Sequence, residues 1–179
     1  YEAEHIIIAT GYYDNHNRLD VPGADLPKVK HYFHEAHPYY NLDVVVLGGK
    51  NSAVDAALEL EKVGARVTVL YRGATYSGSV KPWILPEFDA LVRNEKIKMV
   101  FNATVEEITP TSVVYQVKDP EGDTVEQFTI NNDFVFAMIG YHPDHSFLTK
   151  IGVNIEADTG RPIFNPDTME TNVEDLFIA

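Results

Sequence analysis

The chain has 179 residues, of which 45% are hydrophobic and 23% charged, and this balance suits one globular domain with a sizeable core. The formal net charge of −13 argues against nucleic acid and anionic membranes as partners, because both bind basic faces. No cysteine is present, so the chain's own thiols cannot carry electrons in redox chemistry. The sequence contains neither a signal peptide nor an apolar run long enough to span a bilayer, and we expect a cytoplasmic protein.

Residues 1–42 are predicted to form an entry and linker segment. An extended stretch over 1–10 leads into a polar loop over 11–22. Within residues 28–40, three histidines recur at helical spacing, and imidazoles on one helix face can bind a metal; they are His31, His34 and His37. Because they lack a strict ligand pattern, we interpret them as polar or packing residues and predict no metal site.

A complete βαβ unit follows over residues 43–72. Its two strands are apolar and β-branched, as in buried parallel sheets, and they flank a helix that ends at Gly64. The strands are predicted over Asp43–Leu47 and Arg66–Tyr71. The residues expected at the turn and the helix start are Gly48, Gly49, Asn51 and Ser52, the last two as capping residues.

This strand–turn–helix junction predicts phosphate binding, because free backbone N–H groups and the positive end of the helix dipole meet there. In the fingerprint G-x-G-x-x-G/A, Gly48 fits the first position and Ala53 the last, where a small residue lets the helix lie close to the strand. Lys50 occupies the position of the middle glycine. Its side chain either points away or adds an ammonium to phosphate binding. The alternative for the whole unit is an α/β domain that binds no nucleotide.

The end of the second strand indicates which dinucleotide is bound. NAD-specific folds place Asp or Glu about 20 residues after the glycines, where it binds the ribose hydroxyls. Here that position reads Tyr71-Arg72-Gly73, and a guanidinium favours the 2′-phosphate of NADPH. Lys81 either supplements Arg72 at that phosphate or is a solvated loop lysine beside a core tryptophan, Trp83.

The remaining elements complete an α/β fold. A short helix over 87–94 precedes a third parallel strand over 96–101, and a buried strand returns over 134–139. Between them, residues 104–130 alternate apolar and polar side chains, as half-buried antiparallel strands do. We therefore predict a Rossmann-like parallel sheet with helices and an inserted antiparallel β-meander.

Six segments in this order resemble the nicotinamide-cofactor half of thioredoxin-reductase-like flavoproteins: IIIATG (6–11), VPG (21–23), VVVLGGKNSAVDAALELE (44–61), VTVLYRG (67–73), VFAMIGYHPDHSFL (135–148) and ETNVEDLFIA (170–179). In that family a FAD domain is split around this half. The resemblance implies that residues 1–179 are an NAD(P)H-binding domain excised from a flavoprotein with two dinucleotide-binding domains. Both ends of the chain, apolar strands without polar flanks, fit that interpretation.

The resemblance also implies roles for residues. Those matching the pyrophosphate-binding turn are Gly48, Gly49, Asn51, Ser52 and Ala53, with Lys50 as the departure. Tyr71 and Arg72 match the reader of the 2′-phosphate, although Gly73 replaces a second arginine. Ile139 and Gly140 match the turn near the nicotinamide ribose. Thr10 and Gly11 match the turn that links the two domains beside the flavin.

Thioredoxin reductases carry a Cys-x-x-Cys between the VPG turn and the βαβ unit, and here that span has no cysteine. The YRG ending, Lys50 and the KPW segment resemble the branch of bacillithiol-disulfide reductases, which are NADPH-dependent flavoenzymes. We therefore expect NADPH here and FAD in the missing domain of the same protein, a low-molecular-weight disulfide as substrate, and a homodimer. No acid–base catalytic residue is predicted in this chain. Two alternatives stay open: a ferredoxin- or flavodoxin-NADP reductase of this type, and a non-catalytic NADPH-sensing module.

Overall fold

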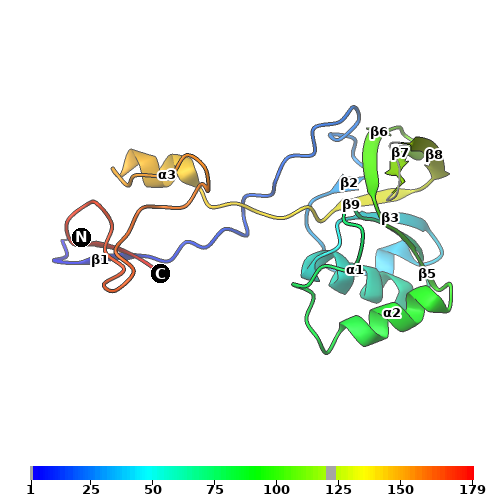
Figure 1. The fold of residues 1–179 in the computed structure, drawn as a ribbon, viewed down its shortest axis with the longest axis horizontal. Coiled ribbons are helices and arrows are strands. Elements are labelled where there is room, and N and C mark those ends of the chain that lie inside the picture. The colour runs from blue at the N-terminus through cyan, green and yellow to red at the C-terminus, as the bar shows by residue number, and fades with distance from the viewer. Residues whose placement is uncertain (1, 120–123) are drawn as a thin grey trace. The chain divides into compact units, whose positions relative to one another are not determined.

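The computed structural model describes residues 2–119 and 124–179, and the chain divides into two units (Figure 1). The larger unit is Arg18–Gly140. The smaller unit combines the two ends of the chain, Tyr1–Asn17 and Tyr141–Ala179. The chain thus passes from one unit to the other twice, and the predicted nucleotide-binding turn belongs to the larger unit.

A five-stranded parallel sheet forms the centre of the larger unit, in the order β2-β9-β3-β4-β5. The strands are β2 (Val29–Lys30), β9 (Phe134–Ala137), β3 (Asp43–Leu47), β4 (Arg66–Leu70) and β5 (Ile97–Val100). The valine-rich strands β3 and β4 are buried over nearly their whole length, as expected for a sheet covered on both faces. All the strands predicted for this sheet are therefore confirmed.

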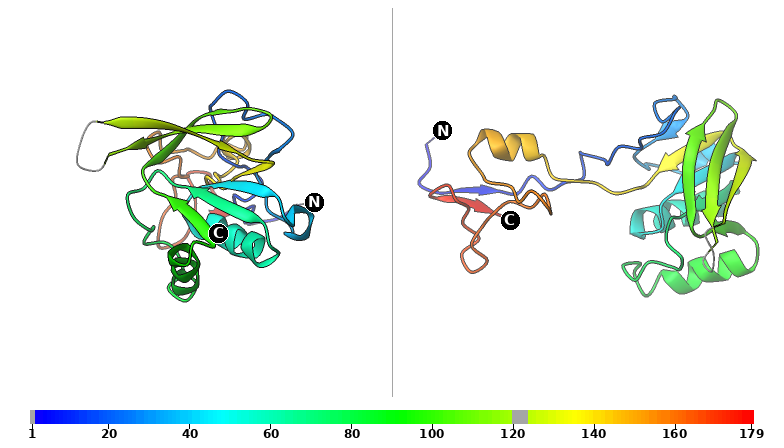
Figure 2. Two further views of the ribbon diagram at one scale, coloured as in Figure 1. Left: turned by 90° about the vertical axis from the view of Figure 1, so that its right-hand side faces the viewer. Right: turned by 45° about the horizontal axis from the view of Figure 1, so that its top comes forward.

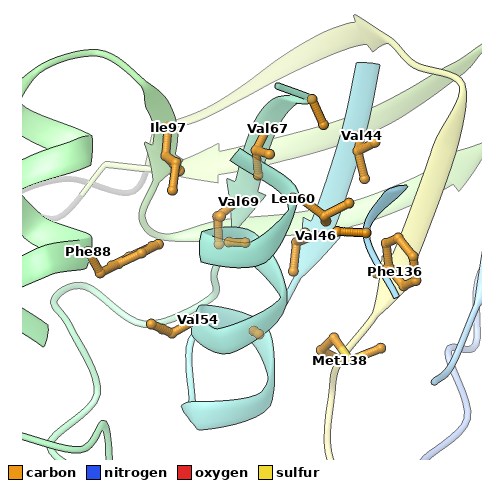
Figure 3. Packing of buried hydrophobic residues seen from close by; sticks show 14 of the residues in the cluster. Val44, Val46, Val54, Leu60, Val67, Val69, Phe88, Ile97, Phe136 and Met138 are labelled. Atoms are coloured by element: carbon orange, nitrogen blue, oxygen red, sulfur yellow. The ribbon is translucent and has the colours of Figure 1, made fainter. Parts of the chain in front are cut away.

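Two helices cover one face of the sheet. Helix α1 (Asn51–Lys62) turns a stripe of small and aliphatic residues inward, and α2 (Leu85–Arg93) contributes Phe88, which is fully buried. Val46 and Val69 of the sheet meet Leu60 of α1 in this layer (Figure 3). The spacing of apolar residues on α1 is the helical period, so one face packs and the other stays in solvent.

The antiparallel strands form a sheet of their own, inserted in the chain between two strands of the parallel sheet, and the predicted inserted meander is thereby confirmed. This meander contains β6 (Ala103–Ile108), β7 (Ser112–Lys118) and β8 (Val125–Asn131), and it follows β5 and precedes β9 in the chain. Figure 2 shows it and the helices on opposite sides of the parallel sheet. Val45 and Leu47 point to the meander, whereas Val44 and Val46 point to the helices, because side chains alternate along a strand.

The smaller unit contains a two-stranded parallel sheet of β1 (Ile6–Ile8) and β10 (Leu176–Ile178), together with the short helix α3 (His145–Lys150). Ile8 and Leu176 enter a small core with Leu148. Ile6 and Ile7, however, are 54% and 69% exposed. A two-stranded sheet with exposed isoleucines buries little apolar surface.

The helical spacing of the histidines within 28–40 does not correspond to a helix. The structure has only the strand β2 and a 3₁₀ turn, η1 (His37–Tyr39), in this stretch. Pro38 lies in that turn and lacks the N–H that a longer helix would use. Among the described residues, no group of three His, Cys, Asp or Glu side chains has an arrangement that fits a metal ion. Within the same residues, no helix combines the length and hydropathy needed to cross a membrane.

Candidate nucleotide-binding site

The turn after β3 lies at the carboxyl edge of the parallel sheet. Leu47 and Leu70 are partners in the β3–β4 register, so the turn and the residues after β4 occupy the same edge. The N–H of Gly48 donates to the carbonyl of Leu70 at 3.0 Å, which closes the turn against β4. This edge is where open α/β sheets bind their ligands.

Gly48 has to be glycine for two reasons. Its φ is +128°, a conformation that other residues rarely adopt, and a Cβ there would lie 2.3 Å from the carbonyl oxygen of Met138. That Cβ would also lie 3.2 Å from the Cβ of Ala53, which is fully buried. The predicted close approach of α1 to the strand is thus present, and it directs the first N–H groups of α1 toward the edge of the sheet.

Gly49 and Gly73 both pack against the ring of Tyr71. A Cβ on Gly49 would lie 2.4–2.6 Å from three atoms of that ring, and a Cβ on Gly73 would lie 2.5 Å from its Cε1. The ring therefore fills the space that side chains at both positions would need. This contact explains why glycine follows Arg72 where the family pattern has a second arginine.

Helix α1 begins at Asn51 with Lys50 as its N-cap residue, and the expected capping by Asn51 and Ser52 is wrong. The side chain of Lys50 makes no capping hydrogen bond to this helix start. The Asn51 amide instead donates to the carbonyl of Ser79 at 2.8 Å, and its oxygen accepts from the N–H of Lys81 at 2.9 Å. Asn51 faces the loop before α2, so the helix end is left with N–H groups for a ligand.

Arg72 is exposed at the end of β4, as a reader of a soluble ligand requires. Lys81 is half-buried, and its ammonium lies 3.3 Å from a carboxylate oxygen of Asp55 on α1. Trp83 is 75% exposed, so the expected core tryptophan beside Lys81 is wrong, whereas the Lys81 side chain is 40% exposed and partly solvated. Lys50 is exposed with φ −101° and ψ −174°, an extended conformation that any residue can adopt.

The other predicted site residues are divided between the two units. Ile139 and Gly140 follow β9 in the larger unit, and Gly140 has a φ of +100°. Thr10 and Gly11 belong to the smaller unit, where they line a shallow cavity of about 240 Å³ with Asp144 and Phe147 among its walls. The glycine turn, Arg72 and the turn after β9 therefore lie at the same edge of the sheet, because Leu47 and Ala137 are partners in the β3–β9 register. Thr10 and Gly11 belong to the other unit.

One participant, Asp55, was not expected from the sequence. Asn51 was expected at the site, but as a capping residue and not as the residue that holds the loop before α2. Gly73, where the family pattern has a second arginine, was a sign in the sequence that Tyr71 packs against this position. Only the position of the Tyr71 ring in the structure explains why a glycine is needed there. Together, the glycine turn, the close helix and the exposed guanidinium fit the phosphates of a dinucleotide.

Comparison with known proteins assigns the family. The model for pyridine nucleotide-disulphide oxidoreductases matches residues 1–179, and the chain belongs to this family of enzymes. The chain is 65% identical over 179 residues to bacilliredoxin reductase Bdr of Bacillus subtilis, which covers 100% of the chain and 54% of that protein. It is also 31% identical over 185 residues to a ferredoxin–NADP reductase of Ignicoccus hospitalis, covering 100% of the chain and 56% of that protein.

A solved structure supports the same assignment. Bacillithiol disulfide reductase Bdr (YpdA) from Bacillus cereus matches with a TM-score of 0.91 and 63% identity, over 98% of this chain and 52% of that one. The resemblance to thioredoxin-reductase-like flavoproteins of the bacillithiol-disulfide reductase branch is thereby confirmed, as is the Rossmann-like fold class. The chain spans about half the length of these relatives.

Proposed function

We propose that this chain is the NADPH-binding half of a flavoenzyme that reduces a low-molecular-weight disulfide. NADPH binds at the carboxyl edge of the larger unit, and the rest of the protein supplies the FAD domain. Bound in this way, NADPH and FAD would supply the hydride transfer and the two-electron reduction of the disulfide, while this chain holds the nicotinamide cofactor. The same proposal includes a cytoplasmic homodimer.

One observation carries the nucleotide assignment: the exposed Arg72 follows β4 at the same edge of the sheet as a turn whose two glycines have no room for a side chain. The first N–H groups of α1 and the positive end of its dipole hold the pyrophosphate at Gly48 and Gly49. Arg72 grips the 2′-phosphate through charge-assisted hydrogen bonds. No acidic residue stands between Arg72 and Glu87, so no carboxylate on this segment repels that phosphate.

The work of this chain in catalysis is positioning. Hydride transfer needs the nicotinamide held against the flavin, and the cofactors perform the chemistry. In this proposal Ile139 and Gly140 lie beside the nicotinamide ribose, while Thr10 and Gly11 link the two domains near the flavin. No side chain here has to accept or donate a proton during the transfer.

Two observations support a missing FAD domain. Ile6 and Ile7 of β1 are exposed in a sheet of only two strands, which further strands would cover. The two Bdr proteins similar to this chain are about twice its length. The thiols that contact the substrate would also lie outside this chain, because it has no cysteine.

The nucleotide assignment is tested by Arg72→Ala, with calorimetric titration of NADPH and NADH. Loss of a charge-assisted bidentate contact should weaken NADPH roughly ten- to a hundredfold and leave NADH almost unchanged. Arg93→Ala is the matched control, because it removes an arginine of α2 that pairs with Asp89 away from the turn. Equal affinities of the unsubstituted chain for NADPH and NADH would contradict the proposal.

A second candidate is a reductase of ferredoxin or flavodoxin, favoured by the similarity to the Ignicoccus protein and by the absence of cysteine. The full-length flavoprotein separates the two functions. Turnover of NADPH with bacillithiol disulfide supports the first, and turnover with ferredoxin alone supports the second. A full-length preparation that never retains flavin would instead indicate an NADPH-sensing module.

A further inference from the structure

The backbone of the loop before α2 is held in place by hydrogen bonds, whereas the side chain of Lys81 in this loop can change its partner. Asn51 holds this loop at the start of α1 through bonds to the Ser79 carbonyl and the Lys81 N–H. The Lys81 ammonium extends from that fixed point on a four-carbon stem and reaches Asp55 at 3.3 Å. The backbone of Lys81 is therefore held at the proposed nucleotide-binding edge, beside Asn51. Its ammonium pairs with Asp55, one turn further along α1.

The ion pair between Lys81 and Asp55 is weak enough to be exchanged. Both side chains are about two-fifths exposed, at 40% and 43%, and pairs that water reaches contribute little to stability. A phosphate carrying two negative charges is a stronger partner for an ammonium than one half-solvated carboxylate. A flexible lysine can change partners without movement of the backbone.

We propose that Asp55 is a specificity-determining residue that competes with the 2′-phosphate of NADPH for Lys81. This inference rests on the proposed function. When NADPH binds, Lys81 leaves Asp55 and joins Arg72 at the phosphate, and the carboxylate loses its partner. NADH offers no phosphate to Lys81, so its binding leaves the ion pair intact. Asp55 therefore lowers the affinity for NADPH but not the affinity for NADH. It reduces the preference for NADPH over NADH that Arg72 establishes.

The test is a double-mutant cycle, since it separates action through Lys81 from direct repulsion. The chain and the variants Asp55→Asn, Lys81→Met and Asp55→Asn with Lys81→Met are each titrated with NADPH and NADH. Asp55→Asn should tighten NADPH roughly threefold, and Lys81→Met should weaken it roughly tenfold. In the Lys81→Met background, the Asp55 substitution should have no effect on NADPH.

Two controls identify a merely structural effect. NADH affinity should be the same for all four proteins, because an altered turn would change it too. Glu59→Gln removes the same charge from the exposed face of α1, where Glu59 pairs with Lys62, and should leave both affinities unchanged. The gain from Asp55→Asn should also shrink at high salt, where partly solvated charges are screened.

Three outcomes would overturn the inference. An equal gain with and without Lys81 would mean that Asp55 repels the phosphate directly. Unchanged NADPH affinity in Asp55→Asn would mean that the ion pair does not compete. Equal binding of NADPH and NADH by the unsubstituted chain would reject the proposed function itself, and that result is read before the cycle begins.

Discussion

Gly49 should tolerate a side chain once the ring of Tyr71 is removed. Gly49 does not have the positive φ that would strain a side chain at Gly48, so its need for glycine comes from the ring alone. An added Cβ would meet three ring atoms at 2.4–2.6 Å, about 1 Å closer than ordinary van der Waals contact. Overpacking of this kind costs about 1–3 kcal/mol.

Urea unfolding of a double-mutant cycle measures this cost. Gly49→Ala should lower the free energy of unfolding by about 1–3 kcal/mol in the natural background and by less than about 0.5 kcal/mol beside Tyr71→Ala. Gly48→Ala is the control, since its Cβ would meet the Met138 carbonyl and its φ is +128°, so Tyr71→Ala should not rescue it. If Gly49→Ala lowered the free energy of unfolding equally in both backgrounds, the Tyr71 ring would not be the cause of the strain, and this explanation would be refuted.

Three further predictions concern charge and cofactor. Lys50→Ala should weaken NADPH and NADH alike, roughly fivefold at low salt and less at high salt, and a Lys50→Gly variant that binds both more tightly would contradict a phosphate contact. The hydrogen bond from Arg66 holds the pKa of Asp43 below its ordinary value, so this stabilisation is present near neutral pH and is lost as pH falls below about 4. Urea midpoints of Arg66→Met should therefore fall less steeply with acid, and parallel slopes would disprove the coupling. The purified chain should be colourless, and stoichiometric flavin absorbance would contradict a separate FAD domain.

The βαβ unit could be predicted closely, because local patterns determine it. Valines in β3 and β4, the glycines after β3 and the apolar period of α1 each favour one structure over a few residues. The arginine after β4 could also be interpreted without coordinates. The proposed phosphate site uses these same residues, which is why most of its candidate residues could be named from the sequence.

The errors arose where distant segments decide the outcome. The side chain of Asn51 was expected to cap its helix, but the loop at Ser79 and Lys81 offers it two bonds, and no local pattern predicts that loop's position. One of the two interpretations of Lys81 placed it beside a core Trp83, yet this side chain is 75% exposed, because nothing local specifies a neighbour that covers it.

The central claim is that NADPH binds at the carboxyl edge of the parallel sheet, with its 2′-phosphate on Arg72. Amide chemical shifts of the labelled chain, titrated separately with NADP⁺ and NAD⁺, test the position and the preference together. Both nucleotides should shift the amides of Gly48 to Ala53, and the difference between them should be confined to Arg72, Lys81 and their neighbours. Shifts confined to the opposite edge, around Asp43 and Arg66, or identical responses to the two nucleotides at equal saturation, would contradict the account.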